Sequence, residues 1–161
     1  GIWYESVLRW VGEANSVIAK GRTFVTQRVA AAGRLRAVRV PEHVVVLADM
    51  VCGAQATFTV SAVTGLMKSS EIVLCGSEGT LRFADGHLYG ARKGDAALQI
   101  VPIPADEAGG WRVEEEFINA IRGIEPVSHT SFADGVKYMD FTEAVVRSMA
   151  EGRELTVPLS G

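Results

Sequence analysis

Residues 55–63 contain the pattern that most restricts how this chain can fold. Apolar and polar side chains alternate strictly in this run, with the apolar set formed by Ala56, Phe58, Val60 and Ala62. A period of two residues is that of a β-strand whose two faces have different surroundings. One face is therefore expected to contact a core while the other stays polar, as in an antiparallel sheet.

Other segments share the character of strands, because they are short, rich in β-branched residues and bounded by turn residues. They are residues 16–19, 22–28, 44–47, 71–74, 79–83, 87–89, 98–103 and 155–158. Cys52-Gly53 and Asp85-Gly86 are predicted to form hairpin turns between neighbouring strands. Pro158 restricts the last strand to the edge of a sheet.

Helical spacing of apolar residues predicts a helix that ends near Gly12, a second over residues 111–122, and a third between Ser131 and Gly152. Ser131 and Asp134 form a capping-box pattern at the start of the third. The residues expected to face a core are Trp3, Val7, Trp10 and Val11, then Val113, Phe117 and Ile121, then Val136, Met139, Val145, Val146 and Met149. Strands between helices predict an α+β protein, with a predominantly antiparallel open sheet and helices on one face.

Length and composition indicate one globular domain. The chain has 161 residues, of which 48% are hydrophobic and 22% charged, values typical of a folded protein. It has neither the run of about 18 apolar residues of a membrane span nor the pattern of a signal peptide. Cys52 and Cys75 form no disulfide framework. They are expected to be buried or half-buried thiols in a reducing, cytoplasmic compartment.

Charge is distributed unevenly along the chain. Residues 1–40 hold seven Lys and Arg against two Glu, a balance of +5, whereas residues 41–161 have a balance of −8. A basic segment can bind phosphate or nucleic acid. Only one aromatic residue, Phe24, accompanies its central cations, and the whole chain is acidic, so nucleic-acid binding is not expected. A solvated strand pair or the rim of an interface fits the segment better.

Motifs for self-sufficient chemistry are missing from the sequence. It contains no GxGxxG or P-loop and no GxSxG or HExxH pattern. His43, His87 and His129 lie far apart. The glycine turn at residues 76–79 joins two strands and opens no helix, so it lacks the positive helix end that binds phosphate. We therefore expect no catalytic, cofactor-binding or metal-binding residues in this chain.

Several motifs in order resemble the C-terminal domain of the Gfo/Idh/MocA oxidoreductases, relatives of glucose–fructose oxidoreductase and inositol dehydrogenase. They are residues 7–13 with Ser16-Val17, the Gly53-Ala54 turn, the strand–turn–strand at residues 72–81, and the closing-helix residues Phe117, Ala120, Ile121, Gly123, 131–137, Glu143-Ala144, Ser148, Gly152-Arg153 and Pro158. The resemblance extends over residues 3–159. It implies a large open antiparallel sheet with helices on one face, of the dihydrodipicolinate reductase-like type.

The resemblance also implies what this chain lacks. In that family an N-terminal Rossmann domain binds NAD or NADP, and a lysine in a Glu-Lys-Pro-type motif assists proton transfer. Neither is present in residues 1–161, since no lysine here precedes a proline. The C-terminal domain of the family lines the substrate site and commonly pairs its sheet with a second subunit. A small-molecule substrate, a missing Rossmann domain and a homodimer are the partners implied, and no nucleic acid or membrane.

The first helix departs from the family pattern. Relatives usually carry an Asp-x-Gly-x-His-x-x-Asp run whose His and Asp reach the substrate. The matching register places Trp3 at the His position and Ser6 at the Asp position, unless the family His lies one residue outside the chain. Trp3, Tyr4 and Glu5 are then candidate substrate-lining residues. For Trp3 the alternative is a core contact of an amphipathic helix.

These observations favour one functional hypothesis and leave an alternative. The first is the substrate-side and oligomerisation domain of an NAD(P)-dependent oxidoreductase that acts on a sugar, polyol or related hydroxy compound, inactive in isolation. The alternative is a free-standing binding or scaffold module derived from that domain. An independent enzyme that uses His87 or His129 has no supporting cluster of residues.

Overall fold

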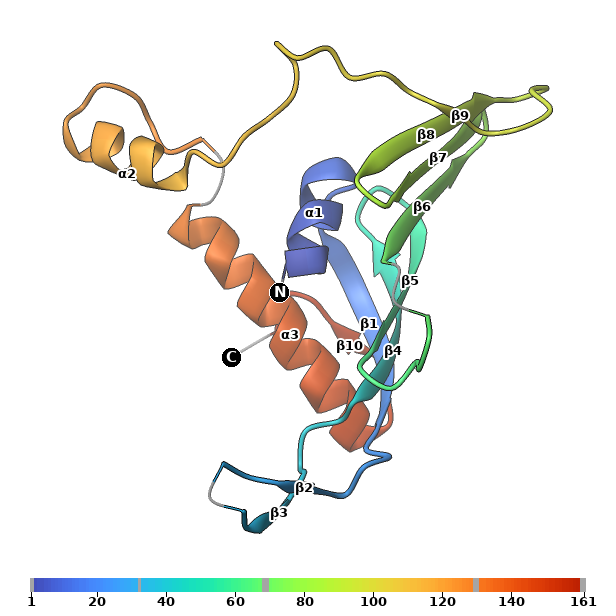
Figure 1. Ribbon diagram of the computed structural model, residues 1–161, viewed down its shortest axis with the longest axis vertical. Helices are drawn as coiled ribbons and strands as arrows, with labels where there is room; N and C mark the ends of the chain where they lie inside the picture. The colour runs from blue at the N-terminus through green and yellow to red at the C-terminus, as the bar shows by residue number, and fades with distance from the viewer. Residues whose placement is uncertain (1, 32, 68–69, 129–130, 160–161) are drawn as a thin grey trace. The chain divides into compact units, whose positions relative to one another are not determined.

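The computed structural model describes residues 2–31, 33–67, 70–128 and 131–159 (Figure 1). Contacts divide the chain into two compact units. The first combines Gly1–Val63 with Glu114–Gly161, and the second is Thr64–Val113. The second unit is thus inserted in sequence between two parts of the first.

An antiparallel sheet with the strand order β10-β1-β4-β5 organises the first unit. Its strands are β1 (Ala14–Arg22), β4 (His43–Met50), β5 (Gln55–Ser61) and β10 (Leu155–Thr156). β10 lies at the edge, as predicted, and the turn between β4 and β5 contains Gly53 with φ of 87°. The alternation predicted for residues 55–63 is confirmed only in the first part of β5, where Ala56 and Phe58 are partly buried while Thr57 and Thr59 are exposed. Val60 and Ala62, predicted to face the core, are exposed, and the strand ends at Ser61.

Helices α1 (Ile2–Trp10) and α3 (Phe132–Glu151) cover one face of this sheet (Figure 1). Tyr4 of α1 connects the layers: its ring stacks on Phe141 of α3 with centroids 3.7 Å apart, and meets Phe58 of β5 edge-on at 6.3 Å. The side chain of Tyr4 is almost fully buried. The predicted capping box at Ser131 and the left-handed Gly152 at the end of α3 are both present. They provide hydrogen-bond partners for the free backbone groups at the two ends of the helix.

A single hydroxyl group fixes α3 to the central strand. Ser148 has no exposed surface; its Oγ accepts a hydrogen bond from Ala19 N at 2.9 Å and donates one to Arg153 O at 2.6 Å. Two residues further along β1, Gly21 lies so close to α3 that a Cβ atom there would stand 2.4 Å from the Sδ of Met149. The helix therefore contacts the strand backbone closely at two successive positions.

Residues 23–42 differ from the prediction of a strand over residues 22–28. β1 continues to Arg22, and a separate ribbon forms from β2 (Gln27–Val29) and β3 (Leu35–Ala37). Between β1 and β2, the amides of Phe24 and Val25 donate to the Glu42 carboxylate at 3.1 and 2.7 Å. The Glu42 carboxylate accepts the hydrogen bonds that the backbone of a neighbouring strand would otherwise accept, so the predicted strand is interrupted at Phe24 and Val25.

The second unit is an antiparallel sheet with the order β6-β7-β8-β9. Its strands are β6 (Glu71–Gly76), β7 (Gly79–Ala84), β8 (His87–Arg92) and β9 (Gln99–Ile100). The turn before β8 has Asp85 and Gly86 at φ of 52° and 76°, as the sequence predicted. The antiparallel α+β class is confirmed, with the strands hydrogen-bonded as two four-stranded sheets and a ribbon among the described residues.

Several residues predicted to be buried are exposed. On α2 (Val113–Ile121), Val113, Phe117 and Ile121 are exposed, and the same holds for Trp3, Trp10, Val136, Met139 and Val146. The spacing of apolar residues identifies the apolar face of a helix, but it does not show whether another element of the chain covers that face. Cys52 and Cys75 are likewise free and exposed rather than buried: Cys52 lies in a turn, and Cys75 lies on the edge strand β6.

Replacement of Ser148 by Ala is expected to lower the free energy of unfolding by about 1–3 kcal/mol, because it leaves the Ala19 amide without an acceptor in a buried position. Urea denaturation followed by circular dichroism measures the change. Ser6→Ala is the matched control, since the partly exposed Ser6 hydroxyl bonds only to its own helix at Ile2 O. A variant Ser148→Ala as stable as Ser6→Ala contradicts the role assigned to this hydroxyl.

Candidate functional site

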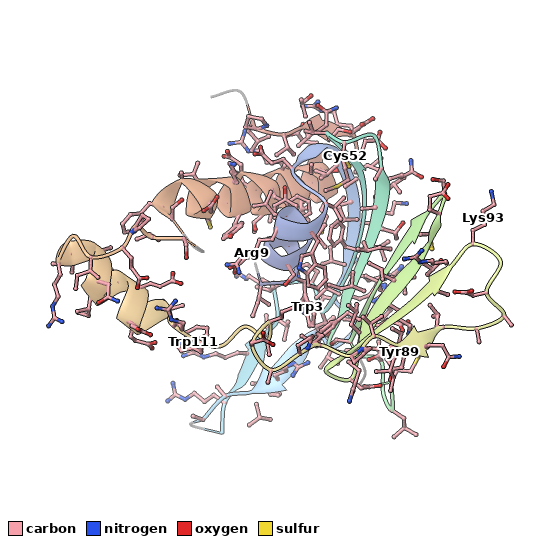
Figure 2. All side chains as sticks on the ribbon, turned by 90° about the horizontal axis from the view of Figure 1, so that it is seen from above. Trp3, Arg9, Cys52, Tyr89, Lys93 and Trp111 are labelled. Atoms are coloured by element: carbon pink, nitrogen blue, oxygen red, sulfur yellow. The ribbon has the colours of Figure 1, made fainter. Side chains whose placement is uncertain are left out.

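The three candidate substrate-lining residues point in different directions from α1. Trp3 is 40% exposed, whereas Tyr4 is 3% exposed. Glu5 is partly exposed and forms an ion pair with Arg9 one turn along the helix. Successive helical residues lie about 100° apart around the axis, so one surface cannot present all three. The core contact considered for Trp3 is made by Tyr4, and Trp3 faces solvent (Figure 2).

Tyr4 also holds the first helix against the start of the sheet. Its hydroxyl oxygen accepts a hydrogen bond from Ala14 N at 3.0 Å, at the floor of a cavity of about 180 Å³ that also contacts Lys137 and Asp140. Burial raises the pKa of the Tyr4 phenol. Tyr4 therefore stays neutral over a wide pH range and positions the helix that carries Trp3.

A larger groove of about 620 Å³ lies where the end of α1, the β4–β5 turn and the first turns of α3 meet. Its polar lining includes Arg9, Glu13, Cys52, Asp134, Lys137 and Tyr138. Figure 2 shows Arg9 on the helix and Cys52 at the turn. The sequence did not predict this groove. Glu13 belongs to the first motif of the family resemblance, but no sequence pattern places it beside Lys137, which lies more than one hundred positions away.

Charges in the groove are arranged as pairs. Lys137 Nζ lies 2.6 Å from Glu13 Oε1, and this hydrogen bond raises the pKa of Lys137. Hydrogen bonds from the side chain and amide of Ser131 lower the pKa of Asp134. Burial, with a smaller contribution from Glu5, raises the pKa of Tyr138. Because the cations and anions offset one another, the groove suits a polar neutral molecule better than a strongly charged one.

The two described histidines belong to different units, and each has its own local contact. His43 begins β4 and packs its ring against Phe24 at 6.3 Å. His87 is in the second unit, where its Nδ1 lies 2.8 Å from Asp85 O, and His129 is outside the described residues. Among the residues that the structure describes, no group of three or more His, Cys, Asp and Glu side chains is placed to hold a metal ion.

The glycine turn at residues 76–79 joins β6 to β7, as predicted. Gly79 is required there by packing, because a Cβ atom on it would approach Ala91 O to 2.3 Å. This close approach of two backbones explains the glycine without a bound phosphate.

Known structures share this architecture. The chain is similar to levoglucosan dehydrogenase in complex with NADH and L-sorbose, at 24% identity and a TM-score of 0.78, over 96% of this chain and 48% of that one. It is similar to an NAD binding oxidoreductase from Klebsiella pneumoniae at 20% identity and a TM-score of 0.75, over 96% and 48%. The chain has the fold of one half of these oxidoreductases.

A third similar structure is the WlbA dehydrogenase from Bordetella pertussis in complex with NADH and UDP-GlcNAcA, at 21% identity and a TM-score of 0.71, over 98% of this chain and 44% of that one. The resemblance to the C-terminal domain of Gfo/Idh/MocA oxidoreductases is thus confirmed as a shared fold. No protein-family model and no curated protein sequence matches the chain. The chain spans about half the length of the structures it matches.

None of the helices in the described part of the chain has the length and apolar character needed to cross a membrane.

The carboxylate of Asp134 is expected to stabilise the protein in a pH-dependent way. Its folded pKa is lowered, so the stabilisation is present above the unfolded value of about 4 and is lost as the pH falls below it. The variant Asp134→Asn should therefore have a lower Tm than the wild type at pH 7, with a difference that shrinks towards pH 3. Thermal denaturation across this pH range measures the difference.

Asp106→Asn, a change of the same type at an exposed position of the second unit, is the control. If its Tm difference from the wild type changes with pH as much as that of Asp134→Asn, the capping carboxylate is not the cause.

Proposed function

We propose that this chain is the substrate-side and oligomerisation domain of an NAD(P)-dependent oxidoreductase that acts on a sugar, polyol or related hydroxy compound. The observation that carries the proposal is the match over 96–99% of this chain to half of levoglucosan dehydrogenase. Three of the similar structures contain NADH, together with L-sorbose, levoglucosan or UDP-GlcNAcA. We therefore propose that the complete protein uses a nicotinamide cofactor and a carbohydrate substrate.

Uncovered apolar surface on the helices supports the presence of a further domain. The exposed apolar residues of α2 and its C-terminal loop are Val113, Phe117, Ile118, Ile121 and Ile124, and those of α3 are Phe132, Val136, Met139 and Val146. Contiguous apolar stripes of this kind usually mark an interface. Contact with a Rossmann domain in the complete protein accounts for them.

NAD or NADP would be held by that other domain. The residues that the structure describes do not fit the cofactor: no glycine-rich turn among them joins a strand directly to a helix, and the close approach of Gly79 to Ala91 fills the turn at residues 76–79. Residues 1–161 alone are therefore proposed to bind no nicotinamide cofactor, to transfer no hydride and to contain no catalytic residue. A cytoplasmic location is part of the same proposal, and two exposed free thiols are compatible with a reducing compartment.

Trp3 is proposed to line the substrate site, while the buried Tyr4 positions the helix that carries it. An indole ring offers an apolar face to the C–H surface of a sugar and an N–H donor at its edge. Glu5 lies about 200° from Trp3 around the helix axis, and its ion pair with Arg9 fixes it on that other side.

The alternative is a free-standing binding module that has lost catalysis. It is favoured by Trp3 and Ser6, which stand where the resemblance places a His and an Asp. The same surface would then bind a sugar without transforming it.

The mass of the natural protein separates the two proposals. An oxidoreductase with a second domain of ordinary size is expected to have about twice the 17.2 kDa of this chain and to respond to micromolar NADH in a fluorescence titration. The 161-residue chain should give no response. A natural protein of 17.2 kDa favours the binding module, and binding of NADH by the 161-residue chain contradicts the proposed division of labour.

In the complete protein, Trp3→Ala is expected to raise KM for the sugar or polyol substrate about tenfold, because it removes an apolar contact worth about 1–2 kcal/mol. Thermal stability should change little, since Trp3 is not part of the core. Steady-state kinetics measure KM and kcat, and Trp111→Ala is the control at another exposed tryptophan. Equal effects of the two variants on KM are not compatible with a substrate contact at Trp3.

A further inference from the structure

The cavity of about 180 Å³ beside Tyr4 lies where α1, the start of β1, α3 and the residues after β10 meet, all within the first unit (Figure 1). We call it the inner cavity. Its polar lining is formed by Tyr4, Glu13, Lys137 and Asp140. A protein cavity of about 150 Å³ is large enough for a molecule with the six heavy atoms of benzene. The inner cavity can therefore hold a ligand of that size, and not only a bridging water.

Tyr4 brings to this cavity a hydrogen-bond donor whose proton has no acceptor in the protein. The Tyr4 residue is 3% exposed, and its hydroxyl oxygen accepts the hydrogen bond of Ala14 N at 3.0 Å. A phenol also has one proton to donate. No atom of the residues that the structure describes accepts this proton. Because a buried donor without an acceptor is costly, the Tyr4 hydroxyl favours a ligand atom that accepts.

Asp140 brings the complementary group. It is a half-buried residue of α3, and within the described part of the chain its carboxylate takes part in no hydrogen bond or ion pair. An ionised carboxylate accepts hydrogen bonds and cannot donate one. The inner cavity is thus lined by one donor and one acceptor that the protein itself leaves unused.

The other two polar groups of the lining satisfy each other. Lys137 Nζ lies 2.6 Å from Glu13 Oε1, and both residues also line the groove of about 620 Å³, so this ion pair borders both spaces. One lysine against two carboxylates leaves the inner cavity with one negative charge, that of Asp140.

This lining discriminates between classes of ligand. An anion is repelled by Asp140, and an apolar molecule leaves Tyr4 and Asp140 without partners. A cation is attracted by the carboxylate, but an ammonium group has no lone pair with which to accept the Tyr4 proton. A hydroxyl group both accepts and donates, so hydroxyl groups satisfy both residues.

We propose that the inner cavity binds a small neutral polyol of about three carbon atoms, at a site separate from the exposed surface that carries Trp3. One hydroxyl group accepts the hydrogen bond of Tyr4, and the same hydroxyl or its neighbour donates to Asp140. The bound polyol connects α1 to α3 through these two bonds. This site goes beyond the proposed function, because it needs neither a nicotinamide cofactor nor a second domain.

Glycerol, propionate and propylammonium test the class of ligand, because they share a three-carbon chain and differ in hydroxyl groups and charge. Titration of the 161-residue chain to about 100 mM of each compound covers the millimolar dissociation constants accessible to so small a ligand. The amide of Ala14, which is hydrogen-bonded to Tyr4, is the reporter in ¹H–¹⁵N NMR spectra. Glycerol is expected to shift this signal to saturation, and the two charged compounds are not.

Substitutions of Asp140 test the site itself. Asp140→Leu removes the acceptor and is expected to weaken glycerol binding about tenfold, whereas Asp140→Asn keeps an amide oxygen and should stay within about threefold of the wild type. Glu143→Leu is the matched control on the exposed side of the same helix, and its affinity should equal that of the wild type. Tyr4→Phe should also weaken binding. The Asp140 variants keep the test decisive if loss of the bond to Ala14 unfolds Tyr4→Phe.

Three results would overturn the proposal. The absence of a saturable shift with glycerol means that the cavity holds water only. Tighter binding of propylammonium or propionate than of glycerol means that the site takes a charged ligand. Equal glycerol affinity of Asp140→Leu and the wild type means that glycerol binds elsewhere. Because the titration uses neither NADH nor an oxidisable substrate pair, its outcome is independent of whether the chain belongs to an oxidoreductase.

Discussion

The buried hydroxyl of Ser148 is the interaction on which the first unit depends. β10 pairs with β1 at Ser16 and Val17 only, so the edge of β1 continues past its partner. At Ala19 the helix α3 supplies the missing acceptor, and the same hydroxyl donates to the turn that leads into β10. A buried amide without a partner is costly. The Ser148 side chain therefore fixes the distance between α3 and β1, and it also holds the turn that leads from α3 into the edge strand β10.

The packing of α1 and α3 on the sheet decides which residues of the first unit are exposed. Tyr4 and Phe141 fill the space between the helices and the sheet, which leaves Trp3 outside and directs the ion pairs of Glu5 and Glu13 towards solvent. The opposite side of the same strands keeps Ile18 and Leu47 exposed. The exposed Trp3 and the exposed Ile18 and Leu47 thus lie on opposite sides of a single sheet.

Local signals made much of this fold predictable from sequence. The capping box at Ser131 and the turn at Asp85-Gly86 depend on neighbours within a few residues, and both are present. The alternation in β5 is present up to Thr59, while Val60 is exposed. The prediction of a strand over residues 22–28 is wrong because Glu42 binds the amides of Phe24 and Val25. Glu42 is separated from them in the sequence by the β2–β3 ribbon. The direction of Trp3 and the groove beside Lys137 depend on contacts between segments that are distant in the sequence, and local sequence patterns do not reveal such contacts.

The insertion of the second unit into the first has a consequence for the order of folding. Pairings among β6, β7 and β8 join neighbours along the chain, so they close short loops and form early. The bond from Ala19 to Ser148 spans 129 residues, and β1 finds its edge partner only near the end of the chain. During synthesis the edge of β1 therefore stays without these partners until the segment that contains Ser148 and β10 has left the ribosome, and an unpaired strand edge of this kind is prone to aggregation.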